Sequence, residues 1–418
     1  MNQSRKKFLV QSAGLLSLSF LQPYQSIVKS FEEKDKFIDN DLPAWDFPPI
    51  SNTIQHAVVI STVELLKTQG QLFLVVTARD GQKGITQCND RMQHLTSLLK
   101  GLVIPHFVNQ DARNILQLVD NAYRLNSNYK YAGMPLWNCI GSVEIAIWDL
   151  LGNIALKPAY QLLGNGVRNE YDVYISDFNR EGIPEKIVEQ LIEKLQITGA
   201  KGIKVKVGGR MSNTAENAAQ TKRYVPALRK KLGDNIIIYA DANGSYLPKD
   251  GIETGKFLED YGITIFEEPC NFEDEEGMLT VSKALKKLKV AGGEQDTSIY
   301  RFKMLSQRKV YDILQPDLYY NGGMLRTLQV SAIAKKYGSA GIAPHTPKAD
   351  PLIAPFWQVA AIIPNLYGLQ ECVYNPGQKD ASWHSAIKII DGKIRIPTTN
   401  GLGIQYDESI WQSAQRII

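Results

Sequence analysis

The sequence GIKVKVGG (202–209) opens the stretch that decides the fold, because three segments of the same kind follow it. They read YADANGS (239–245), IFEEP (265–269) and AGGEQ (291–295). Each contains or follows a short apolar run, and helix-like segments separate the runs. Such runs, bounded by Gly or Pro, are typical of buried parallel strands. The stretch therefore predicts alternating strands and helices.

One carboxylate stands at the end of each of three successive predicted strands. Asp241, Glu267 and Glu294 are spaced 26 and 27 residues apart, which suits one strand, one helix and two loops. In a (β/α) barrel these strand ends face one mouth, where active sites lie. A single acidic strand end is more often a helix cap, but three converging carboxylates need a cation. Oxygen ligands favour a hard divalent ion, so we predict a Mg²⁺ site.

Candidate bases lie on either side of this predicted metal site. Lys204 and Lys206 are two residues apart, so both face the same side of their strand. Buried lysines are costly unless they are paired or functional, and Lys206 could serve as a neutral base. His345 ends the seventh predicted strand and Asp317 the sixth, so the carboxylate could orient the imidazole. The alternatives are solvated strand-end lysines and a structural histidine.

Glu371 ends the eighth predicted strand. A protonated glutamate there could act as an acid or as a hydrogen-bond donor, whereas the alternative is a solvated loop acid. Together these residues suit a single step. A carboxylate substrate binds the metal, Lys206 or His345 removes the neighbouring proton, and the metal and Lys204 stabilise the resulting enediolate. Reprotonation would give racemisation, and loss of a hydroxyl would give dehydration.

The composition is that of an ordinary globular protein. The 418 residues are 44% hydrophobic and 22% charged, and the net charge of +4 argues against a nucleic-acid partner. The four cysteines are far apart without metal-binding spacing, so we expect buried free thiols, at the positions Cys88, Cys139, Cys270 and Cys372.

The N-terminus, residues 1–28, reads as a signal-like segment. Its SRKKFL sequence is similar to a twin-arginine export signal, although Lys6 replaces the second arginine. The apolar stretch is too short and too polar for a stable membrane span. We therefore expect export to a periplasm, and the alternative is a basic leader on a cytoplasmic protein. Residues 29–53 read as a linker.

The rest of the chain divides into three predicted parts. Residues 54–168 read as an α+β domain, with a strand meander in 54–84 followed by helical segments near 90–100, 112–125 and 137–151. Residues 169–371 contain eight strand candidates separated mostly by helices, as in an α/β barrel. Residues 372–418 contain a hairpin with the turn Asp391-Gly392, and we expect this segment to pack on the first domain.

These motifs together resemble the enolase superfamily, and within it the mandelate racemase subgroup of the mandelate racemase/muconate lactonizing enzyme family. The resemblance covers residues 54–418. It rests on Lys204-x-Lys206, Asp241-x-Asn243, Glu267-Glu268-Pro269, Glu294, the pair Asp317 and His345, Asn321-Gly322-Gly323, and AIWDLLGNIALKPAYQLLG (146–164).

The resemblance implies an α+β capping domain over a modified (β/α)₇β barrel. It also implies Mg²⁺, a metal-bound carboxylate substrate and a homo-oligomer, with Asn243, Lys204 and Glu371 as substrate-binding residues. Loops of the capping domain help to close the site in this family. The candidates in this chain are residues 65–70 and 83–91.

Two departures from neighbouring groups narrow the implied reaction. The muconate-lactonising and dipeptide-epimerase groups carry a lysine on the sixth strand, where this chain reads ILQPDLYYNGG (313–323). Galactonate- and mannonate-dehydratase-like members tend to have a histidine at the position of Asn243. What remains is mandelate racemase-like chemistry, which in this subgroup is mostly acid-sugar dehydration, with racemisation or epimerisation of a 2-hydroxy acid as the alternative. A non-catalytic carboxylate-binding protein is a third possibility.

Overall fold

The structure, a computed structural model, describes residues 42–180, 182–349, 351–374, 383–385 and 388–418. By internal contacts the chain divides into Met1–Pro43 and Ala44–Ile418, and the second unit is described below. The predicted signal-like segment, 1–28, lies outside the described residues, and so does most of the predicted linker. Among the described residues no helix is long and apolar enough to cross a bilayer.

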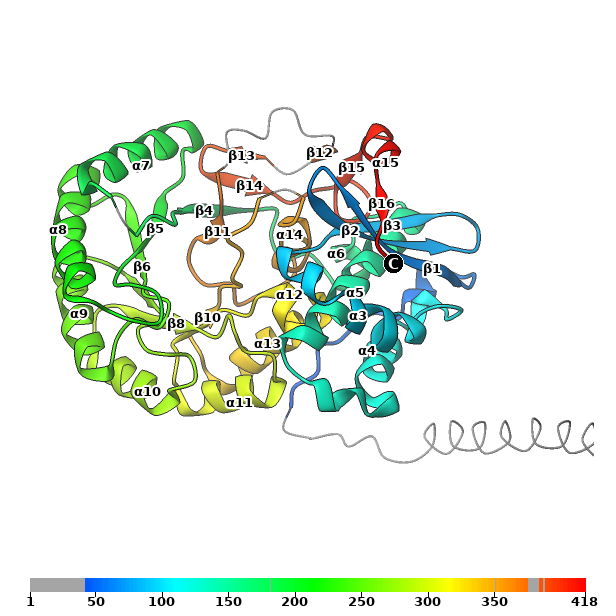
Figure 1. The fold of residues 1–418 in the computed structure, drawn as a ribbon, viewed down its shortest axis with the longest axis horizontal. Coiled ribbons are helices and arrows are strands. Elements are labelled where there is room, and N and C mark those ends of the chain that lie inside the picture. Colours follow the sequence, from blue (N-terminus) through cyan, green and yellow to red (C-terminus); the bar gives the residue numbers. More distant parts are fainter. Residues whose placement is uncertain (1–41, 181, 350, 375–382, 386–387) are drawn as a thin grey trace, which may run out of the picture. The chain divides into compact units, whose positions relative to one another are not determined.

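In the second unit, a short helix, η1 (Ile50–Asn52), is followed by an antiparallel sheet (Figure 1). β1 (Ile60–Thr68) and β2 (Gln71–Ala78) form the predicted meander. Gln69 and Gly70 both have positive φ, which suits a tight two-residue hairpin turn. A third strand, β3 (Lys83–Gln87), was not predicted. It contains Gly84, where a Cβ would lie 2.1 Å from a backbone oxygen of the helix that crosses it.

The helices that follow differ in regularity. The predicted helical segment near 90–100 is a series of short pieces of different type: η2 (Asp90–His94), α3 (Thr96–Leu98), η3 (Leu99–Val103) and η4 (Ile104–His106). Gly101 and Pro105 both disfavour a regular helix there. Next come η5 (Ala112–Asn114), α4 (Ile115–Arg124), η6 (Leu125–Tyr131), α5 (Met134–Ala155) and α6 (Tyr160–Leu163). α5 is buried on nearly every face, as its apolar sequence predicts.

Eight parallel strands form the barrel. In order these are β4 (Glu170–Ser176), β5 (Gly202–Lys206), β6 (Ile237–Asp241), β7 (Ile265–Glu267), β8 (Lys289–Gly292), β9 (Ile313–Leu314), β10 (Gly341–Ile342) and β11 (Gln370–Cys372). β11 pairs with β4, and a bridge between Ile342 and Leu366 joins the remaining edge. The sheet therefore closes on itself.

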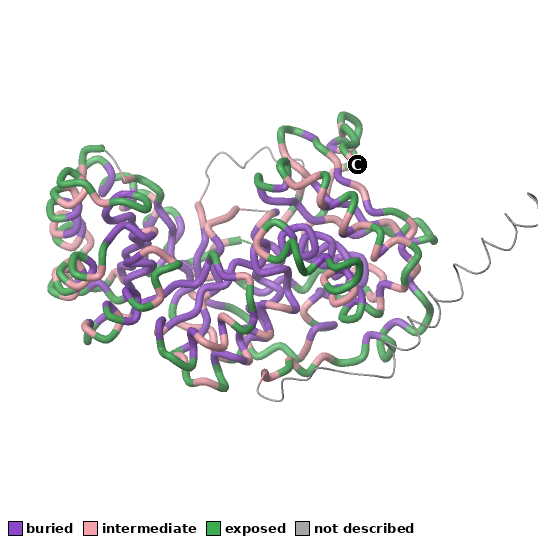
Figure 2. The backbone as a smooth tube through the Cα atoms, turned by 60° about the horizontal axis from the view of Figure 1, so that its bottom comes forward, coloured by how far each residue is buried: buried purple, intermediate pink, exposed green. Residues whose placement is uncertain are grey.

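Helices connect these strands on the outside of the barrel (Figure 1). They are α7 (Pro184–Thr198), α8 (Ala215–Leu232), α9 (Pro248–Asp260), α10 (Glu275–Ala284), α11 (Ile299–Arg308), α13 (Met324–Tyr337) and α14 (Ala354–Ala360). A four-residue helix, α12 (Leu318–Asn321), precedes α13. Among the described residues, the one helix after β11 is the four-residue α15 (Ser409–Gln412) of the C-terminal segment, so the barrel has the expected (β/α)₇β pattern. Buried residues follow the strands, and exposed residues follow the outer turns (Figure 2).

Most barrel strands are shorter than the sequence predicts, and two of them are much shorter. The sixth and seventh predicted strands, which were expected to end at Asp317 and His345, have only two paired residues each, in β9 and β10. Pro316 and Pro344 lie just beyond them and cannot donate hydrogen bonds to a neighbouring strand. The chain therefore leaves the sheet early on this side of the barrel, before it reaches Asp317 and His345.

The C-terminal segment makes contacts in two places. β13 (Ile389–Ile390) and β14 (Lys393–Arg395) form the predicted hairpin, and β14 pairs antiparallel with β4 of the barrel. β16 (Gln415–Arg416) pairs with β1. β12 (Trp383–Ser385) pairs with β15 (Ile404–Tyr406), which is followed by α15 (Ser409–Gln412). All four cysteines are free and buried, as predicted.

Candidate active site

The strand register places three predicted site residues in one row. Lys206 pairs with Asp241 across β5 and β6, and Asp241 pairs with Glu267 across β6 and β7. All three side chains are buried. Parallel strands that end in register bring their last residues to the same mouth of the barrel. The row therefore follows directly from the alternation of strands and helices in the sequence.

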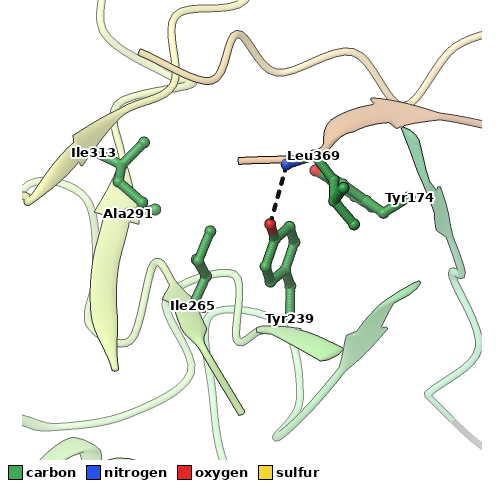
Figure 3. Close-up of a cluster of buried hydrophobic side chains, with 6 residues drawn as sticks. All are labelled: Tyr174, Tyr239, Ile265, Ala291, Ile313 and Leu369. Atoms are coloured by element: carbon green, nitrogen blue, oxygen red, sulfur yellow. Dashed lines mark hydrogen bonds between the residues drawn. The ribbon is translucent and has the colours of Figure 1, made fainter. Parts of the chain in front are cut away.

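A layer of apolar side chains lies beneath this row (Figure 3). Tyr239, Ile265 and Leu369 precede Asp241, Glu267 and Glu371 by two residues each, so each pair shares one side of its strand. The Tyr239 hydroxyl accepts a hydrogen bond of 3.3 Å from the Leu369 amide, which ties opposite sides of the barrel together. This floor excludes water from below, so charges in the layer above interact strongly.

Each predicted carboxylate ligand is paired with a lysine or histidine that was predicted to be catalytic. Lys206 donates to Asp241, and Lys204 lies 3.0 Å from both oxygens of Glu267. His345 Nε2 lies 2.9 Å from Glu294 Oε2. The three carboxylates thus meet three nitrogen bases inside one buried site, and their charges largely compensate one another.

Burial and pairing with lysine oppose each other, and their balance shifts the pKa values of Asp241 and Glu267 in different directions. Burial opposes ionisation of Asp241, but Lys206 and Lys204 lower its pKa to about 2. Burial raises the pKa of Glu267 to about 7, and Asp241, Glu371 and Glu294 add to this against the opposing effect of Lys204. Of the two carboxylates in the row, Glu267 is therefore the one that holds a proton more easily near neutral pH.

Glu371 completes the site on the far side of Lys204. Its Oε1 lies 2.7 Å from Lys204 Nζ, and its Oε2 accepts a 2.8 Å hydrogen bond from the Thr346 amide. Burial opposes its charge, but Lys204 and His345 lower the pKa of Glu371 to about 2. These contacts favour Glu371 as an ionised partner of Lys204 in this arrangement, rather than as the protonated donor that the sequence hypothesis allowed.

His345 lies between two carboxylates. Its Nδ1 faces Asp317 Oδ2 at 2.9 Å, so the expected contact between these two residues is present. Because the groups on Nδ1 and Nε2 are both acceptors, the ring donates from both nitrogens and carries a positive charge. Burial opposes this charge, but Glu294 and the hydrogen bonds with Asp317 and Glu294 raise the pKa of His345 to about 10.

Several neighbours of this site were not predicted from the sequence. Lys348 Nζ lies 2.5 Å from Asp317 Oδ2, and Gln315 Nε2 donates to Glu267 Oε2 at 2.8 Å. Gln315 precedes Asp317 by two residues, so strand periodicity could have identified it. Lys348 lies in an irregular loop after β10, and no periodic signal points to it.

Glu268 is another unpredicted neighbour. Alternation along a strand would turn it away from Glu267, but β7 ends at Glu267 and Glu268 has a φ of +43°. The side chain is buried, and its Oε1 has no hydrogen-bond partner among the described residues. Burial and the charges of Glu294, Asp241 and Glu267 raise its pKa well above the ordinary value. Glu268 therefore belongs to the same electrostatic cluster.

Asn243 lies beside Lys206, at the edge of the row. Its Oδ1 accepts a 3.2 Å hydrogen bond from Lys206 and another from Arg180, which no sequence signal had indicated. On the other side of the site the predicted closing segment 83–91 reaches the barrel, because the Arg91 guanidinium lies 4.7 Å from the centre of the Tyr320 ring.

The buried donor atoms of Glu267, Glu294 and His345 lie within 4.8 Å of one another, the arrangement of a candidate metal site. This set differs by one member from the predicted ligands. Asp241 Oδ1 accepts a 2.8 Å hydrogen bond from the Asn243 amide and Oδ2 accepts from Lys206, so both oxygens are engaged. The buried Glu268 Oε1, which has no hydrogen-bond partner among the described residues, is compatible with a cation bound in this cluster.

Comparisons with known proteins agree with this architecture. Residues 51–164 match the family described as "Mandelate racemase / muconate lactonizing enzyme, N-terminal domain", and residues 186–410 match "Enolase C-terminal domain-like". Arabinonate dehydratase of Saccharolobus solfataricus is 25% identical over 87% of this chain and 92% of its own length. D-mannonate dehydratase of Caulobacter vibrioides is 26% identical over 81% of this chain and 89% of its own.

A solved structure shows the same fold. It is the mandelate racemase/muconate lactonizing protein of Paracoccus denitrificans complexed with magnesium, which superposes with a TM-score of 0.79. The match covers 86% of this chain and 99% of that protein at 23% identity. The capping sheet and the closed barrel are therefore a shared architecture.

Proposed function

The chain belongs to the mandelate racemase/muconate lactonizing enzyme family of the enolase superfamily, and on that premise we propose that it dehydrates an acid sugar. The substrate would be an aldonate or aldarate, and the product a 2-keto-3-deoxy acid. The reaction begins with removal of the proton beside the substrate carboxylate. The relatives described above, which are acid-sugar dehydratases by name, support this choice of substrate class.

One observation carries the proposal: Lys206 and His345 stand on opposite sides of the same carboxylates. Lys206 contacts Asp241 on β6, whereas His345 contacts Glu294 just beyond β8, and Glu267 on β7 lies between them. A substrate carbon held above Glu267 would have one base on each face. Dehydration needs a base that takes the α proton and an acid that protonates the leaving hydroxyl.

The carboxylates provide the place for Mg²⁺. Glu267 and Glu294 would hold the ion, with Asp241 as the third ligand, because oxygen donors are the ones that Mg²⁺ prefers. When bound, the ion would neutralise this cluster and stabilise negative charge that develops on the substrate carboxylate. The magnesium in the Paracoccus denitrificans protein supports the identity of the metal.

The remaining residues have roles that follow from their contacts. Lys204 is buried and positively charged, since Glu267 and Glu371 outweigh the effect of burial and raise its pKa well above the ordinary value. It would bind a carboxylate oxygen of the substrate and stabilise its developing charge. Asn243 would bind a substrate hydroxyl next to Lys206, and Glu371 would hold Lys204 in place.

We assign the acid by charge. His345 is the proposed acid, because its contacts keep the ring protonated at neutral pH, and Lys206, on the opposite side, is then the proposed base. Asp317 holds the ring through Nδ1 and leaves Nε2 directed into the site. A proton on Nε2 can then pass to the leaving hydroxyl.

The second candidate function is racemisation or epimerisation of a 2-hydroxy acid. The same pair of bases favours it, because a proton removed by Lys206 can be replaced from the His345 side. The third, a non-catalytic carboxylate-binding protein, would leave buried lysines and a buried histidine without a chemical role.

Proton NMR in D₂O with Mg²⁺, over a library of acid sugars and 2-hydroxy acids, tests the proposal. Dehydration predicts loss of the signal beside the carboxylate and a new deoxy-methylene signal. Loss of the first signal without a new product would instead support racemisation. If no compound exchanges although Mg²⁺ binds to the protein, the catalytic assignment is contradicted.

A further inference from the structure

A buried glutamate outside the barrel contacts the segment that carries Asp317. Glu144, on α5, is fully buried and accepts three hydrogen bonds. They come from Trp148 Nε1 at 2.7 Å, the Met324 amide at 2.9 Å and the Leu325 amide at 3.0 Å. Met324 and Leu325 are the first residues of α13, whose opening N–H groups have no acceptor within the helix. A side chain of α5 thus caps a barrel helix.

The turn before α13 lies directly on α5. Gly322 and Gly323 both have positive φ, and a Cβ on Gly323 would lie 2.1 Å from Glu144 Oε2. A Cβ on Gly141 of α5 would lie 2.7 Å from the Gly323 nitrogen. Side chains are therefore absent on both sides of this contact, which lets Glu144 hold the backbone itself.

This turn also ends α12, and Asp317 caps the N-terminus of α12. Asp317 Oδ1 accepts from the amides of Tyr319 at 2.9 Å and Tyr320 at 3.3 Å, while Oδ2 faces His345. α12 has only four residues, and it packs against α5 (Figure 1). A helix this short has little rigidity of its own. Its direction therefore depends on how its two ends are held.

We propose that Glu144 is a positioning residue for Asp317 and His345. By fixing residues 322–325 to α5, its carboxylate sets the direction of α12 and hence the direction of Asp317 Oδ2. The catalytic consequence rests on the proposed function, but the positioning itself does not. The N-terminal part of the chain thereby positions His345, whereas the barrel strands position the other base, Lys206.

Glu144→Gln tests this with almost no change in shape. Both carboxylate oxygens of Glu144 accept backbone N–H groups, so an amide NH₂ would face a donor at one of them. Asp149→Asn is the matched control. Asp149 also lies buried on α5 and accepts two backbone amides, but these belong to Ile85 and Leu402.

The measurement is ¹⁵N-histidine NMR of the full chain with Mg²⁺, with the ring signals of His345 assigned through His345→Asn. Glu144→Gln is expected to shift or broaden the hydrogen-bonded Nδ1 proton of His345, whereas Asp149→Asn leaves it unchanged. In a turnover assay, Glu144→Gln should lower kcat about tenfold or more with little change in KM.

The proposal is overturned if Glu144→Gln and Asp149→Asn lower the melting temperature alike and both leave the His345 signals unchanged. If Glu144→Gln does not fold, Glu144→Asp is the second variant, because it keeps the carboxylate but retracts it by one methylene. Unchanged His345 signals in Glu144→Asp would overturn the proposal as well. The NMR readout needs no substrate, so a wrong proposed function would not hide the result.

Discussion

Lys206 and His345 flank the same carboxylates, but different means hold them in place. Lys206 ends β5, whose pairing with β6 continues without a break from Gly202 to Lys206. His345 follows β10, which has two paired residues, and its ring is held by Asp317. Asp317 is held in turn by Lys348 and by α12. One side of the site is built by the sheet, and the other by side-chain contacts between loops.

This difference predicts how each side responds to substitution. A residue in a continuous ladder keeps its backbone position when a neighbouring side chain changes. A residue held by a chain of side-chain contacts moves when any member of the chain is lost. Changes remote from the chemistry should therefore affect His345 more than Lys206.

The largest effect is expected at Glu267, which lies between the two sides. Glu267→Gln removes a charge that contacts Lys204 and would bind the proposed metal. Catalysis by Lys206 and by His345 should therefore be lost together. We expect loss of Mg²⁺ binding by calorimetry and a decrease in kcat/KM on the order of 10³-fold or more. The control is Glu170→Gln, because Glu170 forms an exposed ion pair with Lys393 at the start of β4. Unchanged Mg²⁺ affinity in Glu267→Gln would exclude it as a ligand.

The next effect is the pH dependence of metal binding. Burial raises the pKa of Glu267 to about 7, so below this pH the metal must displace a proton. Mg²⁺ affinity should fall as the pH is lowered through 7, by up to about tenfold per pH unit for one displaced proton. Calorimetry in two buffers of different ionisation enthalpy measures the proton release. An affinity that is the same above and below pH 7 would contradict the role of Glu267.

The sequence predicted the sheet-built side almost completely. The period of two placed Lys204 and Lys206 together, and the regular spacing placed Asp241 next to Glu267, because strand register is a local property. The pairing of His345 with Asp317 was also expected. Lys348 and Glu144 were not, because their contacts join residues 31 and 180 positions apart and follow no periodic pattern. Glu268 was missed because the strand ends one residue before it.

A smaller effect is expected at Lys348. Lys348→Met removes one of the groups that hold Asp317, and a hydrogen bond to a charged group contributes about 1.5–3 kcal/mol. We expect kcat to fall about tenfold while exchange at the Lys206 side persists, as measured by turnover and by exchange in D₂O. Lys194→Met is the control, because Lys194 pairs with a different aspartate, Asp177, at 3.1 Å. Equal effects of the two substitutions would argue against a special role for Lys348.

The smallest effect concerns the packing of the sheet-built side. A Cβ on Gly202 would lie 2.6 Å from Leu369 Cδ1 and 2.9 Å from the Ile237 oxygen. Gly202→Ala should therefore lower the free energy of unfolding by about 1–3 kcal/mol. Gly101→Ala has open space around the added methyl group and serves as the control. Denaturant unfolding measures the free energy of unfolding of both variants. If Gly202→Ala leaves this free energy unchanged, the sheet-built side tolerates the added methyl group.

The most direct test of the two-sided site is deuterium exchange at the α carbon, compared in Lys206→Met and His345→Asn with Mg²⁺ present. For an acid sugar whose α proton faces Lys206, we predict that Lys206→Met loses exchange by about 10²–10⁴-fold. His345→Asn should keep the exchange and lose formation of the dehydrated product. If both variants lose exchange equally, or if both keep it, the two residues are not separate bases on opposite sides of one substrate.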